Sequence, residues 1–216
     1  MIVGMIVEGK YDSAALPLFC DNELELAATY QRIFPDLDAT GGDEFVDGGW
    51  TQLIERIINE AKYGLKSRFD SGLFDDEPPL DCLIIHLDLD IARLFLEKYR
   101  NVNLDTSSEL NSVVHFHGEF LNFLTSIDDE APLNKIILAC PAPCTDGWIL
   151  LGLGGNWVWN ERSSETKKKL RQTANGCHKS PEKYRDYASS AAGNADTISR
   201  TSASYARFSA DLKDLI

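Results

Sequence analysis

The chain lacks the long apolar runs that mark membrane proteins. No stretch approaches the roughly 18 uninterrupted apolar residues that a membrane helix needs. The N-terminus shows no basic region followed by an apolar stretch and a cleavage site. We therefore expect a cytoplasmic protein without membrane contact. There is also no internal repeat or low-complexity linker, and 216 residues are enough to bury a sizeable core.

The cysteine pattern argues against a disulfide framework. The chain has five cysteines, an odd number, and their spacing is irregular: Cys20, Cys82, Cys140, Cys144 and Cys177. A zinc site could in principle use Cys140, Cys144 and the Cys177-His178 pair as its ligands. However, Pro141 and Pro143 occupy the loop, and the spacing fits no strong zinc motif. We expect buried thiols that behave as small apolar side chains.

Two common catalytic motifs are missing. There is no Gly-Xaa4-Gly-Lys-Ser/Thr loop, so this chain alone should not hydrolyse ATP. There is no Gly-Xaa-Ser-Xaa-Gly elbow for a serine hydrolase either. We expect His86, His115 and His117 to have structural roles, since no acidic pair lies near the latter two in sequence and His86 ends an apolar run.

Basic residues are scarce, and they are unevenly distributed. The formal net charge is −13, whereas binding to phosphate backbones relies on Lys and Arg. Residues 1–160 carry 10 Lys and Arg against 27 Asp and Glu, but residues 161–216 carry 11 against 7. A basic run of this kind is more often a solvated helix face than a binding patch. It is still the first place to look for phosphate contacts.

Apolar runs alternate with segments of helical spacing along the chain. The runs predict strands at residues 2–8, 81–87 and 135–140. The spacing predicts helices at residues 13–20, 22–33, 50–65, 91–100, 108–127, 164–174, 181–191 and 202–215, and the segment from Val113 could instead begin as a strand. Residues 36–48 read as a short strand or turn, residues 66–79 as an acidic loop and residues 152–163 as a further loop.

This order predicts an α/β fold with a mainly parallel sheet flanked by helices. We expect residues 1–160 to form a metal-binding domain and residues 161–216 to form a helical, more basic C-terminal extension packed on it.

Two acidic motifs each follow an apolar run. Glu8 follows residues 1–7, and Asp88 and Asp90 follow residues 82–85. Ligands bind at the carboxyl ends of the strands in open parallel sheets, so these carboxylates would meet there if the two strands are adjacent. Three carboxylates at one sheet edge repel each other unless a hard cation such as Mg²⁺ or Mn²⁺ lies between them. Capping of the following helix is the alternative role for the pair.

The two motifs resemble those of the TOPRIM domain, the metal-binding module of topoisomerases, primases and OLD-family nucleases. Glu8 and Gly9, with Asp12 shortly after, match the glutamate motif that follows the first TOPRIM strand. Asp88 and Asp90 match the Asp-Xaa-Asp motif. The resemblance covers about the first 150 residues. It implies a TOPRIM-like sheet and a site in which Glu8 is a metal ligand or general base.

The same resemblance extends to later residues. Small TOPRIM-like proteins related to the OLD nucleases carry an acidic residue near an aromatic one after the corresponding strand, and Asp146 with Trp148 resembles this pattern in shifted form. Asp146 could be a further metal ligand or a helix cap. The tail around Lys179 and residues 202–208 also resembles those proteins, so Lys179 or Lys183 could stabilise a phosphate or leaving group.

These patterns predict a metal-dependent nuclease that uses Mg²⁺ or Mn²⁺. The resemblance further implies DNA or RNA as substrate and an ATPase or other protein partner in bacterial or phage defence. The acidic charge of residues 1–160 leaves two alternatives open. One is a non-catalytic regulatory or assembly subunit that binds a protein partner. The other is a metal-dependent phosphohydrolase acting on nucleotides.

Overall fold

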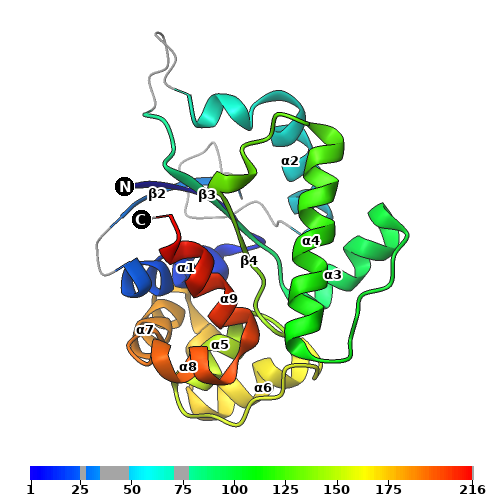
Figure 1. Cartoon of the computed structure of the whole chain (residues 1–216). Helices are drawn as coiled ribbons and strands as arrows, with labels where there is room; N and C mark the ends of the chain where they lie inside the picture. The colour runs from blue at the N-terminus through cyan, green and yellow to red at the C-terminus, as the bar shows by residue number, and fades with distance from the viewer. Residues whose placement is uncertain (25–27, 35–48, 71–77, 216) are drawn as a thin grey trace.

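The computed structural model describes residues 1–24, 28–34, 49–70 and 78–215. Their centre is a parallel sheet of four strands in the order β2-β1-β3-β4 (Figure 1). The strands are β1 (Ile2–Ile6), β2 (Thr29–Phe34), β3 (Cys82–His86) and β4 (Ile136–Ala139). The expected α/β fold with a parallel sheet is therefore confirmed. The expectations for residues 36–48 and for most of the acidic loop lie outside the described residues.

The two central strands are adjacent and covered on both faces. β1 pairs with β3 from Val3–Cys82 to Ile6–Ile85. Every residue of β3 is buried. Near-continuous apolar sequence is typical of parallel strands covered by helices on both sides. The adjacency brings the ends of β1 and β3, and so the two acidic motifs, to one edge of the sheet.

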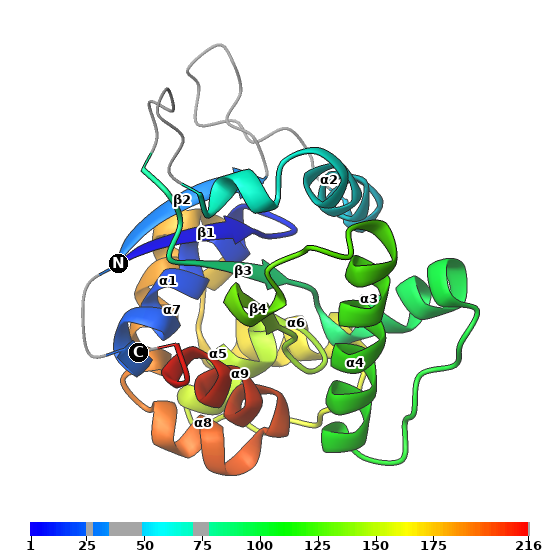
Figure 2. The same cartoon turned by 45° about the horizontal axis from the view of Figure 1, so that its top comes forward.

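Helices pack on each face of the sheet to form three layers (Figure 2). One face carries α2 (Trp50–Tyr63), α3 (Leu89–Phe95) and α4 (Glu109–Ile127). The other carries α1 (Lys10–Leu24), α5 (Thr145–Gly152), α6 (Ser163–Thr173), α7 (Pro181–Ala192), α8 (Ala195–Thr201) and α9 (Ala203–Lys213). Alternate side chains of each strand supply the two cores: Leu83 and Ile85 face the first, and Cys82 and Ile84 face the second. No helix in the described ranges is long and apolar enough to cross a membrane.

Two predicted elements differ from the structure. The helix expected over residues 22–33 is wrong, because α1 ends at Leu24 and β2 begins at Thr29. Tyr30 and Ile33 favour a strand, and pairing with β1 satisfies the backbone of this segment. The alternative that residues from Val113 begin a strand is also wrong. Ser108 caps α4 by accepting a hydrogen bond from the Asn111 amide, and the helix continues through the whole segment.

The C-terminal helices share the core of the sheet rather than only touching its surface. Tyr205 and Phe208 of α9 pack against Phe19 of α1 and Trp148 of α5. The hydroxyl of Ser202, at the start of α9, donates a buried 2.7 Å hydrogen bond to Glu109 of α4. The tail motif at residues 202–208 therefore joins elements from both faces of the sheet.

Candidate metal centre

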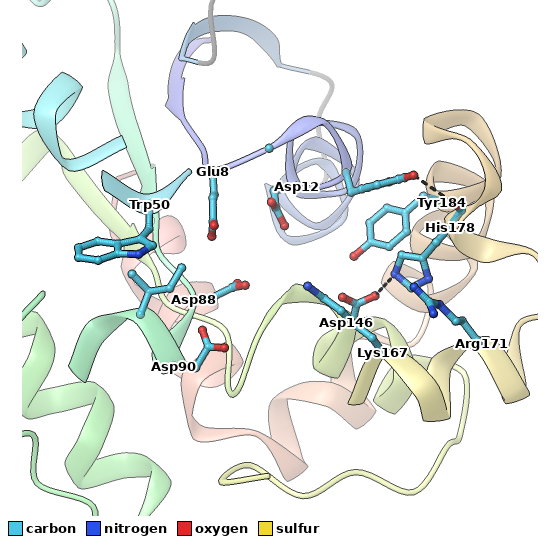
Figure 3. Close-up of a pocket in the computed structure, with 13 residues that line it drawn as sticks. Glu8, Asp12, Trp50, Asp88, Asp90, Asp146, Lys167, Arg171, His178 and Tyr184 are labelled. Carbon is cyan, nitrogen blue, oxygen red and sulfur yellow. Dashed lines mark hydrogen bonds and ion pairs between the residues drawn. The ribbon is translucent and has the colours of Figure 1, made fainter. Parts of the chain in front are cut away.

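The acidic motifs meet in one pocket of about 550 Å³ beyond the ends of β1 and β3. Glu8 lies two residues after β1, Asp88 two residues after β3, and Asp90 in the first turn of α3. All three line the pocket, and their carboxylates lie around its centre (Figure 3). The expectation that the two motifs lie together thus agrees with the geometry.

A fourth carboxylate joins them because of the turn after β1. Gly9 accepts a 3.0 Å hydrogen bond from the amide of Ser13, so α1 starts immediately and Asp12 falls in its first turn. The Asp12 side chain lines the same pocket. Sequence reasoning noted Asp12 near this helix start but did not count it among the ligands. Its spacing of four residues from Glu8 was the available signal.

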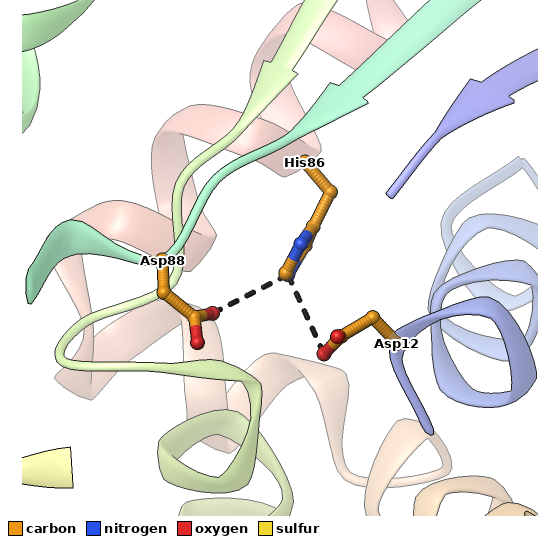
Figure 4. A group of neighbouring side chains, drawn as sticks. All are labelled: Asp12, His86 and Asp88. Atoms are coloured by element: carbon orange, nitrogen blue, oxygen red, sulfur yellow. Dashed lines mark ion pairs between the residues drawn. The ribbon is translucent and has the colours of Figure 1, made fainter. Parts of the chain in front are cut away.

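His86 lies between two of these carboxylates (Figure 4). Its Nε2 atom is 3.5 Å from Oδ1 of Asp88 and 3.9 Å from Oδ1 of Asp12. One ligand atom of Asp12, one of His86 and one of Asp88 lie within 4.8 Å of one another. His86 is fully buried, and its expected packing at the end of the strand is observed. The position of His86 beside Asp12 and Asp88 was not predicted from the sequence.

Thr145 ties this group together from α5. Its hydroxyl donates to Oδ1 of Asp12 at 2.7 Å and lies 2.8 Å from Nε2 of His86. Its amide donates to Oδ1 of Asp88 at 3.2 Å. Since the hydroxyl proton goes to Asp12, the Thr145 oxygen accepts from Nε2–H of His86. Thr145 of α5 therefore contacts all three of Asp12, His86 and Asp88.

The concentration of carboxylates changes their protonation. Burial, together with Asp12 and Asp90 nearby, raises the pKa of Glu8 to about 7. Burial also raises the pKa of Asp88 well above its usual value, and Asp12 and Asp90 add to this effect. Burial lowers the pKa of His86, which keeps the imidazole neutral. A bound cation would stabilise the charged form of these carboxylates.

Asp146 lies in the same pocket but has a partner already. It sits in the first turn of α5 and is 4% exposed. Its Oδ1 atom is 2.6 Å from Nε2 of His178. Cys144, rather than Asp146, occupies the cap position of this helix. The structure therefore places Asp146 beside the other acids as a side chain hydrogen-bonded to His178.

Two cationic side chains line the pocket opposite Trp50, and neither was singled out from the sequence for catalysis. Lys167 and Arg171 are one turn apart on α6, and Lys167 extends toward the carboxylates (Figure 3). Burial alone would lower the pKa of Lys167, but acidic neighbours including Asp146 and Asp88 raise it, so the side chain stays charged. Lys179 is exposed and is not among the residues that line this pocket.

The cysteines do not form a zinc site. All five are buried and free, as expected. Within the described ranges, the side chains that gather with metal-binding geometry are those of Asp12, His86 and Asp88. Cys144 contacts Asp146 through a 3.9 Å hydrogen bond from its thiol.

Comparison of the chain with protein-family profiles, with curated proteins and with solved structures finds no match in any of the three. The TOPRIM-like assignment therefore stays a prediction that rests on the two acidic motifs.

Proposed function

We propose that the protein is a metal-dependent phosphodiester hydrolase, most simply a nuclease. The observation that carries this proposal is the composition of the pocket. It combines a group of carboxylates with Lys167 and Arg171, for which the described residues provide no ion-pair partner. Carboxylates alone would suit many cations, whereas carboxylates facing two free cationic groups suit a metal-bound phosphate ester.

The donor set fits a divalent ion. Oxygen atoms of Asp12 and Asp88 lie close enough to share one ion, and Glu8 and Asp90 offer further oxygens beside them. The raised pKa values of Glu8 and Asp88 support this fit, since burial and the neighbouring carboxylates disfavour the charged forms that a cation would stabilise. A divalent ion held there would activate water and offset the charge that develops on the phosphate.

Lys167 and Arg171 would bind the phosphate. Their positions four residues apart place them on one face of α6, toward the acids. Lys168 and Lys169, by contrast, form ion pairs with Glu165 and Glu161. Lys167 and Arg171 are thus the members of this helix that can neutralise a substrate anion.

Glu8 would accept the proton of the attacking water. A general base must lie within reach of the water that it activates, and Glu8 lines the pocket beside the carboxylates that would hold the ion. Its carboxylate points into the pocket beside Asp12 and Asp88 (Figure 3). Glu8 would therefore alternate between the charged and neutral forms during turnover.

The far wall of the pocket suits a nucleoside. Trp50 lies on the side away from Lys167 and Arg171 (Figure 3). Ile91 also lines the pocket. An aromatic face stabilises a stacked base by about 1–3 kcal/mol. Trp50 would contact the base or sugar while the basic pair holds the phosphate.

The test compares Asp88→Asn with Asp129→Asn, an exposed carboxylate in a turn away from the site. Both variants and the wild type would be assayed with Mg²⁺ and Mn²⁺ on single- and double-stranded DNA, RNA and free nucleotides. We expect cleavage that EDTA abolishes, that Asp88→Asn reduces at least about 100-fold and that Asp129→Asn retains.

The outcomes separate the alternatives. Activity confined to free nucleotides would identify a nucleotide phosphohydrolase instead. Metal binding without cleavage of any substrate, alone or with a co-purified ATPase, would contradict the nuclease proposal and favour the regulatory subunit. Undiminished activity in Asp88→Asn would exclude the pocket as the active site.

A further inference from the structure

We propose that His86 is a nitrogen ligand of the metal, and that the site therefore prefers first-row transition ions to Mg²⁺. This inference rests on the metal centre of the proposed function and specifies which ions it takes. The juxtaposition that carries it is an imidazole placed between Asp12 and Asp88 at the end of β3.

The distances are those of ligands to one ion. Metal–nitrogen and metal–oxygen bonds of roughly 2.0–2.2 Å allow two ligand atoms of one ion to be up to about 4.4 Å apart. Nε2 of His86 is 3.5 Å from Oδ1 of Asp88 and 3.9 Å from Oδ1 of Asp12. Both separations fall within this limit, and one ligand atom from each of the three side chains lies within 4.8 Å of the other two, so small side-chain shifts would let one ion contact all three.

The hydrogen bonds of the imidazole leave it able to change tautomer. Nε2–H donates to the hydroxyl of Thr145. Nδ1 of His86 is buried, and no described residue provides it with a hydrogen-bond partner. Among the described residues, no hydrogen bond to Nδ1 therefore fixes the proton on Nε2. The proton can move to Nδ1, and Nε2 can then present its lone pair to the ion beside Asp12 and Asp88.

The chemistry of the donors then sets the preference among ions. Mg²⁺ favours an all-oxygen, regularly octahedral environment and keeps much of its water. Imidazole is a better ligand for the later first-row ions, whose affinity for a given site rises along the series from Mn²⁺ through Fe²⁺ and Co²⁺. A site with one imidazole and two carboxylates should bind Co²⁺ more than about tenfold more tightly than Mg²⁺.

The experiment uses the full chain and two histidine variants. His86→Gln removes the proposed ligand, and His178→Gln removes the histidine that lines the pocket. Circular dichroism would establish that each variant is folded. Isothermal titration would measure the affinities for Mg²⁺, Mn²⁺ and Co²⁺. Electron spin-echo spectroscopy of bound Mn²⁺, with natural and ¹⁵N-labelled histidine, would report directly on a coordinated nitrogen.

We expect a histidine nitrogen signal in the wild type that persists in His178→Gln and disappears in His86→Gln. The ratio of Co²⁺ to Mg²⁺ affinity should fall at least about tenfold in His86→Gln. If His86→Gln does not fold, the signal in the wild type and in His178→Gln decides, because His115 and His117 lie on α4, where they contact Asp105 and Asp211.

Bound Mn²⁺ without a nitrogen signal, together with unchanged affinities in His86→Gln, would overturn the role of His86. That result would leave the carboxylate site of the proposed function standing. Failure of the wild type to bind any of the three ions would overturn both.

Discussion

At the scale of single residues, the main feature is a set of acids kept close together at a cost in stability. Glu8 and Asp88 have raised pKa values because they are buried near Asp12 and Asp90. Groups of this kind are typical of functional sites. Such an arrangement persists only when the surrounding fold stabilises it, and here Thr145 supplies hydrogen bonds to two of the acids.

The metal-free protein should become less stable as the pH rises from about 5 to 8. A carboxyl whose pKa is higher in the folded state binds more protons when the chain is folded. Its contribution to the free energy of unfolding is complete below the unfolded pKa. This contribution is lost as the pH rises through the folded pKa, which is about 7 for Glu8. Asp88→Asn removes one of the repelling charges. Its melting temperature without metal should exceed that of the wild type at pH 8, and by more than at pH 5.

Thermal melts in EDTA at both pH values would test this prediction, with Asp129→Asn as the control. Each kcal/mol corresponds to about 2–4 °C for a chain of this size. Saturating Mn²⁺ should raise the melting temperature of the wild type but not that of Asp88→Asn. A lower melting temperature for Asp88→Asn at pH 8 would contradict the electrostatic interpretation.

Lys167 and Lys179 should differ in their effect on catalysis. Lys167 lines the pocket, whereas Lys179 is exposed outside it. A hydrogen bond to a charged group contributes about 1.5–3 kcal/mol, so Lys167→Ala should lower kcat/KM about 10- to 100-fold. Lys179→Ala should change it by less than about twofold. Steady-state kinetics of the two variants would decide, and the reverse order of effects would assign the phosphate contact to Lys179.

At the scale of elements, the position of the site depends on how α5 packs. Every residue of α5 is buried, and its first turn supplies Asp146 to the pocket and Thr145 to the hydrogen bonds with Asp12 and Asp88. At its other end, Gly152 lies against α7. A Cβ at residue 152 would come within 2.6 Å of the Ala191 carbonyl oxygen. The absence of a side chain there lets the two helices approach closely.

Gly152→Ala should therefore destabilise the protein by about 1–3 kcal/mol, because overpacking forces helices apart. Gly118→Ala is a matched control on α4, where an added Cβ would meet nothing within 4 Å. That change should be neutral or stabilise by up to about 1 kcal/mol, since alanine favours the helix. Chemical denaturation of both variants would measure the difference, and equal stability of the two would contradict the packing argument.

At the scale of the whole molecule, the C-terminal helices complete one side of the sheet. Helices α7 and α9 form one core with α1 and the strands. Val3, Met5 and Ile84 belong to this core, so their burial depends on residues beyond 160. The acidic and basic parts of the chain meet at the pocket, since Lys167 and Arg171 come from α6. The basic tail thus completes a site whose acids come from earlier elements.

A fragment of residues 1–160 should fail to fold by itself. Removal of residues 161–216 would expose the apolar side chains of one sheet face, and each large apolar side chain contributes about 1.5–3 kcal/mol through burial. We expect aggregation, or a dispersion of amide NMR signals typical of an unfolded chain. A folded fragment with a cooperative thermal transition would show that the first 160 residues are an independent domain.

The α/β class and the position of the main acids could be predicted from the sequence alone. Strongly periodic or apolar segments predicted β1, β3, β4 and most helices correctly, because burial on both faces leaves a clear pattern. The error over residues 22–33 arose where local propensity was weak and pairing with β1 decided the structure. Glu8, Asp88 and Asp90 were found because each motif follows a buried strand.

Which residues join these acids depends on packing between distant parts of the chain. The strand order put β1 beside β3, the start of α1 put Asp12 in the pocket, and α6 brought Lys167 and Arg171 to it from a distant part of the chain. His86 has an ordinary position at a strand end, and its place between Asp12 and Asp88 depends on three elements packing together. Residue spacing reports local periodicity, whereas a metal centre is defined by distances across the fold.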